Sequence, residues 1–243
     1  MQVVTTVSFK GGVGKTTALM ALACAAAARG ERVLLIDSDQ NLPMTEWQVT
    51  GQKNDYWSDL VRVEEHMNFD TLHKSVLTHD DAGDVDLVLI DSKGGRSDFH
   101  NALVQIVDIV LVPTRPLKVD ADQVVTTLQW MRKLESEGID TAPAYILFAA
   151  IKSASQLSPD MVFMRDTLMR APHLTAQLPE RVTFNNMQAR GLLSEITATL
   201  AADADPLARG QARPYRNALA EATAVLDEVR AKIQTAELAE TGS

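Results

Sequence analysis

The chain has 243 residues and a single cysteine, Cys24, so no disulfide can form within it. Such sparing use of cysteine is typical of a reducing compartment, and we expect the protein in the cytoplasm. Cys24 stands in the middle of an alanine-rich stretch. We therefore interpret it as a small buried hydrophobic side chain rather than as a reactive thiol.

Long hydrophobic runs are also absent. The longest, "TTALMALACAAAA", is too short to cross a bilayer, and no basic segment followed by an apolar run suggests secretion. The net charge of −9 excludes a uniformly basic nucleic-acid binder but not a local basic patch. Neither repeats nor low-complexity linkers interrupt the chain. We expect residues 1–243 to form a single domain, with a disordered tail over the last eight or so residues.

Five short apolar runs predict buried strands: "QVVTTVS", "RVLLID", "DLVLID", "DIVLVP" and "AYILFAA". Helical stretches separate them, including "SPDMVFMRDTLMR" with Ser158 as its N-cap. This alternation predicts an α/β fold with a doubly wound, mostly parallel sheet flanked by helices. Ligands of such sheets bind at the carboxyl ends of the strands. The pattern is weak over residues 186–206, and the last clear helix is expected from about Tyr215 to Ala236.

The segment "GGVGKTT" follows the first strand and opens a helix, which is the context of a phosphate-binding P-loop. Its glycines let backbone N–H groups approach phosphates, and the helix N-terminus adds a favourable dipole. Lys15 is expected to reach the β- and γ-phosphates, Thr16 to ligate Mg²⁺ and Thr17 to support the α-phosphate. The predicted nucleotide-binding residues of this segment are Gly11, Gly12, Val13, Gly14, Lys15, Thr16 and Thr17.

Three aspartates follow predicted strands. Asp91 ends a run of four apolar residues, where a P-loop enzyme carries the acid that holds Mg²⁺. Asp37 ends another strand, and Asp39 follows it in "IDSDQN". Carboxylates there can reach a metal ion or an attacking water, although aspartates also cap loops after strands. We favour the functional interpretation, with Asp37 and Asp91 joining Thr16 at the metal.

A second lysine, Lys10, precedes the P-loop lysine by five residues. With it, "KGGVGKTT" resembles the deviant Walker A box of the ParA/MinD superfamily, "DSDQN" is similar to its switch I, and "LIDSKGG" to its switch II. The runs "DSDQNLPMTEW" and "FNNMQARGLL" resemble the VirC-type ATPases of conjugative and virulence plasmids. The resemblance covers the first 120 residues and, more loosely, residues 179–193.

The resemblance implies a P-loop ATPase that uses ATP and Mg²⁺, with Lys10, Lys15 and Asp39 as its catalytic residues. In this superfamily the early lysine reaches the phosphates of the nucleotide in a second subunit, as an arginine finger does elsewhere. ATP binding would then create a homodimer, and hydrolysis would dissolve it. Asp39 would position the attacking water and Asp37 would help to order the metal shell. Pro179, in "LPERVTFNN", would border the adenine, unless it is an ordinary turn proline.

The resemblance also implies partners and a location. The ATP-bound dimer would bind DNA non-specifically, lie at the nucleoid or the cell pole, and partition or position a plasmid, a DNA-transfer complex or another large cargo. A ParB-like or cargo adaptor protein would stimulate the weak intrinsic hydrolysis. Phosphate contacts supply non-specific DNA affinity, although a solvated basic stretch is an equal alternative for the densest late cluster. Its members are Arg190, Arg209, Arg213 and Arg216.

Two other functions on this fold stay open, a MinD-like membrane cycle and a metabolic P-loop reaction. The segment "VRAKIQTAELAETGS" has few bulky apolar residues, which argues against stable membrane association. Cys24 alone cannot ligate an iron–sulfur cluster. The chain departs from the superfamily at Lys93 and Gly94, where prolines are usual, and in the residue order of switch I. We favour a solvated side chain for Lys93, with contact to the nucleotide or the partner subunit as alternatives. For Arg115 we favour a surface turn, with contact to the nucleotide as the alternative.

Overall fold

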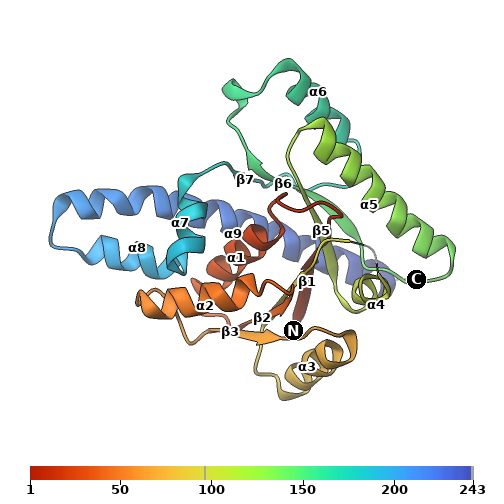
Figure 1. The fold of residues 1–243 in the computed structure, drawn as a ribbon, viewed down its shortest axis with the longest axis horizontal. Coiled ribbons are helices and arrows are strands. Elements are labelled where there is room, and N and C mark those ends of the chain that lie inside the picture. Colours follow the sequence, from red (N-terminus) through yellow and green to blue (C-terminus); the bar gives the residue numbers. More distant parts are fainter. Residues whose placement is uncertain (96, 242–243) are drawn as a thin grey trace.

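A seven-stranded parallel sheet forms the centre of the computed structural model, which describes residues 1–95 and 97–241 (Figure 1). The order of the strands is β3-β2-β4-β1-β5-β6-β7, and their described pairings are all parallel. The strands are β1 (Gln2–Thr6), β2 (Val33–Ser38), β3 (Val61–Glu65), β4 (Leu87–Ser92), β5 (Ile109–Thr114), β6 (Ala144–Ile151) and β7 (Leu178–Pro179).

Helices cover both faces of the sheet, which confirms the predicted doubly wound α/β fold. One face packs against α1 (Lys15–Ala27), α2 (Pro43–Lys53), α7 (Val182–Arg190), α8 (Leu193–Ala202) and α9 (Pro206–Thr241). The other packs against α3 (Phe69–Ala82), α4 (Asp98–Ile106), α5 (Lys118–Ser136) and α6 (Pro159–Leu168), and a 3₁₀ turn, η1 (Ala154–Gln156), precedes α6. Among these described helices, none is both long enough and apolar enough to cross a membrane.

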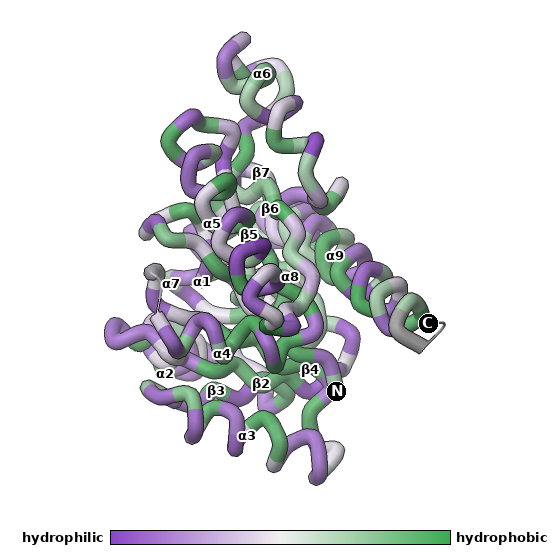
Figure 2. Tube along the Cα trace, turned by 90° about the vertical axis from the view of Figure 1, so that its right-hand side faces the viewer, coloured by the Kyte–Doolittle hydropathy of each residue, from purple (hydrophilic) through white to green (hydrophobic). Residues whose placement is uncertain are grey.

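Strand β2 is apolar over Val33–Ile36 because both of its faces are buried. In β2, Val33 and Leu35 pack into the core on one face of the sheet, and Leu34 and Ile36 into the core on the other. All four side chains are fully buried. Because both faces are covered, neither set of alternating positions can be polar. The tube is coloured hydrophobic around β2 and β4 in the interior (Figure 2).

Helix α1 is buried on every side. Its residues Ala18–Ala27 are all buried, between the sheet and the helices of the same layer. The small alanine side chains let the helix lie close to several neighbours at once. Cys24 is fully buried within this helix, and burial raises the pKa of its thiol to about 12. The structure therefore confirms that Cys24 is a buried small side chain.

The C-terminal third differs most from the expectation. The weakly patterned residues 186–206 contain most of α7 and all of α8, and α9 begins at Pro206 rather than near Tyr215. Pro214 lies inside α9. Because a proline usually interrupts a helix, the sequence did not predict that the helix starts before it. The helix runs to Thr241, so most of the expected disordered tail is helical; residues 242 and 243 lie outside the described residues. In Figure 1, α8 and the start of α9 project side by side from the body.

A glycine after α7 allows the chain to approach α2. Gly191 has a φ of 131°, and a Cβ built on it would lie 2.3 Å from the carbonyl oxygen of Tyr56 and 2.9 Å from the Cα of Gly51. We therefore expect Gly191→Ala to lower the free energy of unfolding by more than about 2 kcal/mol, through backbone strain and overpacking.

The matched control is Gly210→Ala in α9, where nothing lies within 4 Å of an added Cβ. Alanine there should raise the free energy of unfolding by about 0.5–1 kcal/mol, because it loses less backbone entropy in a helix. Urea denaturation followed by circular dichroism measures both changes. Equal effects of the two substitutions would contradict the close approach at Gly191.

Candidate nucleotide site

The predicted site residues meet where three neighbouring strands end. β4 lies between β1 and β2, and the register aligns Asp37 of β2 with Asp91 of β4. The loop after β1 leads directly into α1, whose first residue is Lys15. The carboxyl ends of these parallel strands therefore bring the P-loop and the acids to one edge of the sheet, as the sequence predicts.

The conformation of the P-loop requires its glycines. Gly12 and Gly14 have φ angles of 75° and 97°, in the left-handed region that favours glycine. A Cβ on Gly14 would also lie 3.3 Å from the Cβ of Ala149 in β6. Gly14 thus combines a left-handed turn with close packing against the sheet, immediately before α1 begins.

A pocket of about 590 Å³ opens beside this loop. It brings the P-loop together with the end of β6, with β7 and with the start of α7, and Pro179, the residue expected to border the adenine, is part of its wall. Arg115 also lines it, whereas the sequence favoured a surface turn for that residue. The lining residues include Gly12, Val13, Gly14, Lys15, Thr16, Thr17, Arg115, Ala149, Ala150, Gln156, Pro179, Glu180, Arg181, Phe184 and Asn185.

Lys15 lies half-buried at the back of the loop. Burial lowers the pKa of its ammonium group, while the carboxylates of Asp91 and Asp39 favour the charged form. The loop after β4 passes close to it, because a Cβ on Gly94 would lie 3.3 Å from Lys15 Nζ. Glycine at this position therefore leaves room for the lysine.

Thr16 and Asp91 form a pair suited to a magnesium ion. The Thr16 hydroxyl donates a hydrogen bond of 2.6 Å to Asp91 Oδ2, while Asp91 Oδ1 is buried and has no hydrogen-bond partner. Burial raises the pKa of the Asp91 carboxyl to about 6, against the effect of the Thr16 bond, and nearby Asp37 adds to the rise. A buried carboxylate with an unused oxygen beside a threonine hydroxyl fits Mg²⁺, which prefers oxygen ligands and often takes only one or two carboxylates.

Asp37 and Asp39 have different surroundings. Asp37 Oδ2 accepts hydrogen bonds from the backbone N–H groups of Met44, at 2.8 Å, and Thr45, at 3.1 Å. Asp37 therefore caps the N-terminus of α2, the structural alternative considered for these acids. Asp39 is half-buried, and its Oδ1 accepts a bond of 2.9 Å from the N–H of Asn41. Of the two, Asp39 keeps the less engaged carboxylate.

Lys10 does not point freely into solvent. Its Nζ lies 2.5 Å from Asp120 Oδ1, and Arg115 Nε donates to Asp120 Oδ2 at 2.7 Å. The Asp120 side chain is fully buried, while those of Lys10 and Arg115 are each 35% exposed. Sequence reasoning missed Asp120, because it lies 110 residues from Lys10 and belongs to no recognised motif.

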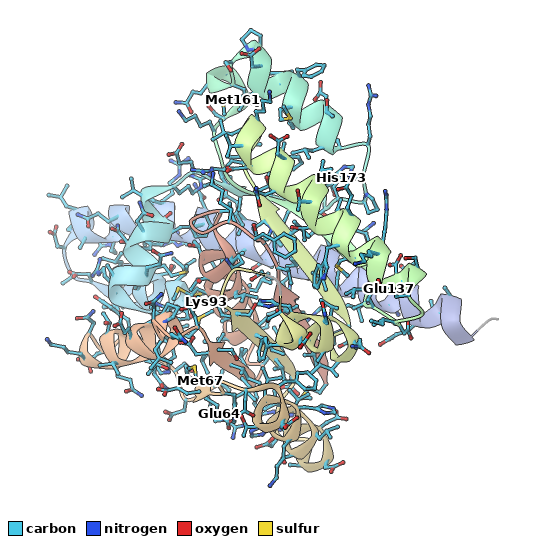
Figure 3. The ribbon with its side chains drawn as sticks, turned by 45° about the vertical axis from the view of Figure 1, so that its right-hand side comes forward. Glu64, Met67, Lys93, Glu137, Met161 and His173 are labelled. Carbon is cyan, nitrogen blue, oxygen red and sulfur yellow. The ribbon has the colours of Figure 1, made fainter. Side chains whose placement is uncertain are left out.

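A second pocket, of about 380 Å³, lies between the loops after β2, β3 and β4. Figure 3 labels Met67 and Lys93, two of its lining residues. His100, buried in α4, holds the loop of this pocket: its Nε2 lies 2.7 Å from the Lys93 carbonyl oxygen, and its Nδ1 lies 2.8 Å from Ser97 Oγ. Burial lowers the pKa of His100, so a neutral ring donates to the carbonyl and accepts from the serine. The Lys93 side chain is exposed, as expected.

Gln188 is a further residue that the sequence did not single out. Its side-chain amide donates a hydrogen bond to Thr17 Oγ1, which connects α7 to the P-loop. The available signal was the run "FNNMQARGLL", which contains Gln188 and was noted for its resemblance to VirC-type proteins. Without the fold, nothing in that run indicated contact with Thr17, 171 residues earlier in the chain.

The structure divides the four candidate DNA-binding arginines into two pairs. Arg190 stacks 5.0 Å from the centre of the Tyr56 ring and bonds to the hydroxyl of that residue. Arg209 donates to the backbone carbonyl oxygens of Asp203 and Ala204, in the turn after α8. Arg213 and Arg216 are exposed on α9. Only the second pair presents guanidinium groups without a described structural contact.

The fold and this site define the chain as a P-loop protein of the ParA/MinD type. Residues 1–235 match the VirC1 protein family, and the chain belongs to that family. The virC1 protein of Rhizobium radiobacter is 30% identical over 225 residues, which cover 93% of this chain and 96% of that protein. The resemblance to ParA-like ATPases of the VirC type is thus confirmed.

Solved structures show the same fold. The structure of pnob8 ParA has a TM-score of 0.64 at 16% identity and covers 95% of this chain and 99% of its own. A putative plasmid partition protein from Borrelia burgdorferi, bound to AMPPNP, has a TM-score of 0.59 at 15% identity, covering 90% of this chain and 98% of its own.

The raised pKa of Asp91 has a consequence for stability. The unfolded carboxyl ionises near its ordinary pKa of 3.8 and the folded one near 6, so its charge costs stability increasingly between these pH values and fully above pH 6. We expect Asp91→Asn, which keeps an acceptor for Thr16, to raise the free energy of unfolding at pH 8 by up to about 3 kcal/mol, and by much less at pH 4.

Chemical denaturation of the ligand-free protein at both pH values measures this difference. The control is Asp86→Asn, because the pKa of Asp86 lies at about 2, lowered by its hydrogen bonds with Arg32. This substitution should not stabilise the protein at pH 8. A gain from Asp91→Asn that is the same at pH 4 and pH 8 would contradict the buried-charge explanation.

Proposed function

We propose that the chain is an ATPase that cycles between an ATP-bound homodimer and an ADP-bound or nucleotide-free monomer. The observation that carries this proposal is Lys10, a partly exposed second lysine directly ahead of the P-loop. Lys15, which lines the pocket, would serve a nucleotide bound in the same subunit. Lys10, once released from Asp120, would be available to serve a nucleotide bound in another copy of the chain. Membership of the VirC1 family and the AMPPNP-bound partition protein with this fold support the proposal.

Hydrolysis would use groups that the fold brings together. Asp39 would position the attacking water, while Lys15 and the Lys10 of the partner subunit would stabilise charge that develops on the γ-phosphate. Asp91 and Thr16 would hold Mg²⁺, with Asp37 fixing the loop after β2 through its bonds to the start of α2. The bound ion would neutralise part of the phosphate charge. Gly11 to Thr17 would surround the phosphates, and Pro179 would border the adenine.

The ATP-bound dimer would bind DNA without sequence preference and partition or position a plasmid, a DNA-transfer complex or another large cargo. Arg213 and Arg216 are the contacts that the structure supports best, since Arg190 and Arg209 already bond within the chain. A ParB-like or adaptor protein would stimulate hydrolysis and release the dimer. The protein would work in the cytoplasm, at the nucleoid or the cell pole, without stable membrane association.

Two substitutions test the cycle. Asp39→Ala should trap a dimer in the presence of ATP and Mg²⁺, because the water is no longer positioned, while Lys10→Ala should stay monomeric. Size-exclusion chromatography with light scattering, run with ATP, with ADP and without nucleotide, measures the mass. Lys53→Ala, at an exposed lysine in α2, is the control and should behave as the wild type. ATP-independent behaviour of all variants would favour a metabolic P-loop enzyme.

A second pair of substitutions tests the DNA surface. The double charge reversal Arg213→Glu and Arg216→Glu should weaken ATP-dependent DNA binding at least tenfold, because it replaces phosphate contacts by repulsion. Reversal of Arg132 and Arg170, exposed arginines of the α5–α6 region, controls for the change in net charge. Gel retardation of a long duplex at several salt concentrations measures the affinity. Equal losses in both double variants would place the DNA elsewhere or reduce the effect to net charge.

A further inference from the structure

The buried carboxylate of Asp120 holds two cations at once, Lys10 through one oxygen and Arg115 through the other. The order of the strands explains this meeting. β1 and β5 are neighbours in the sheet, so the loop after β1, with Lys10, lies beside the segment after β5, with Arg115 and Asp120. Although burial opposes it, the hydrogen bonds from Arg115 and Lys10 keep the pKa of Asp120 below its ordinary value. The carboxylate is therefore charged at neutral pH.

We propose that Asp120 is a latch that retains Lys10 on its own subunit, and that releasing it sets how readily the nucleotide-bound chain dimerises. The inference rests on the proposed function, because it concerns the same lysine that would reach the nucleotide of the second subunit. To reach a phosphate of the partner's nucleotide, the Lys10 ammonium group has to leave Asp120 Oδ1, from which it lies 2.5 Å. The carboxylate and the phosphates of the partner's nucleotide thus compete for one ammonium group.

Arg115 makes this exchange feasible. Removing the sole partner of a buried carboxylate would leave an uncompensated charge, which is strongly unfavourable. When Lys10 leaves, Asp120 keeps the guanidinium of Arg115 at 2.7 Å, so its charge stays paired. Lys10 is also the more movable cation, since a lysine is a point charge on a flexible stem, whereas the planar guanidinium of arginine is more rigid. Asp120 therefore positions Lys10 in the monomer and can release it when the dimer forms, because its charge stays paired with Arg115.

Two variants should move dimerisation in opposite directions. Asp120→Asn removes the charge that retains Lys10, so the dissociation constant of the dimer with Mg²⁺ and AMPPNP should fall about tenfold. Arg115→Gln leaves Lys10 as the only cation on Asp120, so the same constant should rise by a similar factor. Asp122→Asn, at an exposed acid on the same helix, is the matched control and should change nothing. Sedimentation velocity of the full chain over a range of protein concentrations measures the constant.

Two further measurements separate the latch from a merely structural ion pair. Acylation of the Lys10 amine without nucleotide, followed by peptide mass spectrometry, should be several-fold faster in Asp120→Asn than in the wild type and unchanged in Asp122→Asn. Binding of a fluorescent ATP analogue to each variant corrects for a direct effect of Arg115, which lines the pocket. If Asp120→Asn fails to fold, the Arg115→Gln result still decides, because that side chain is one-third exposed.

The outcomes distinguish the two proposals. A wild-type chain that stays monomeric with Mg²⁺ and AMPPNP overturns the proposed function, and this inference with it. A wild-type chain that dimerises, with Asp120→Asn no tighter or Arg115→Gln no weaker after correction for nucleotide binding, overturns only the latch. Unchanged acylation of Lys10 in a folded Asp120→Asn variant also overturns it. Opposite shifts of the two variants, together with faster acylation, support it.

Discussion

The arrangement of the site depends on the burial of α1. Ten consecutive residues, Ala18–Ala27, are buried, and their small side chains allow the helix to lie against the sheet and α9 together. The first residue of the helix is Lys15, so packing that holds the helix also holds the end of the P-loop. An interior of this kind is close-packed and resists displacement. The left-handed Gly14 then connects the rigid helix to the loop without steric cost.

The same packing buries charged side chains, and several of them lie beside a group of opposite charge or a hydrogen-bond partner. Lys15 lies half-buried near Asp91 and Asp39, Asp91 accepts the hydroxyl of Thr16, and Lys10 is held by Asp120. Buried charges are costly unless they are paired. A metal ion that enters the pocket with a nucleotide would therefore displace the bond between Thr16 and Asp91 and use the unpaired Oδ1 of Asp91.

Much of the fold and of the site was accessible from sequence. The continuous apolar strands predicted a parallel sheet covered on both faces, and "GGVGKTT" predicted the phosphate loop, because both patterns depend on neighbouring residues. The sequence did not predict the beginning of α9, because Pro214 lies inside it, or the helices before it, because their periodicity is weak. The arginine cluster shows a different limit: four nearby arginines look equivalent in sequence, but Arg190 stacks on Tyr56 while Arg213 is exposed.

The sequence by itself determined the chemistry that short motifs carry: the glycine-rich loop, the lysines at its two ends, and the acids that finish the strands. Each of these follows from the conformation or charge of adjacent residues. Only the tertiary structure decided that Asp37 caps α2, that Gln188 reaches Thr17, and that Asp120 holds Lys10. The physical reason is the order of the strands. Neighbours in the sheet are not neighbours in the chain, so β1 beside β5 joins charges 110 residues apart.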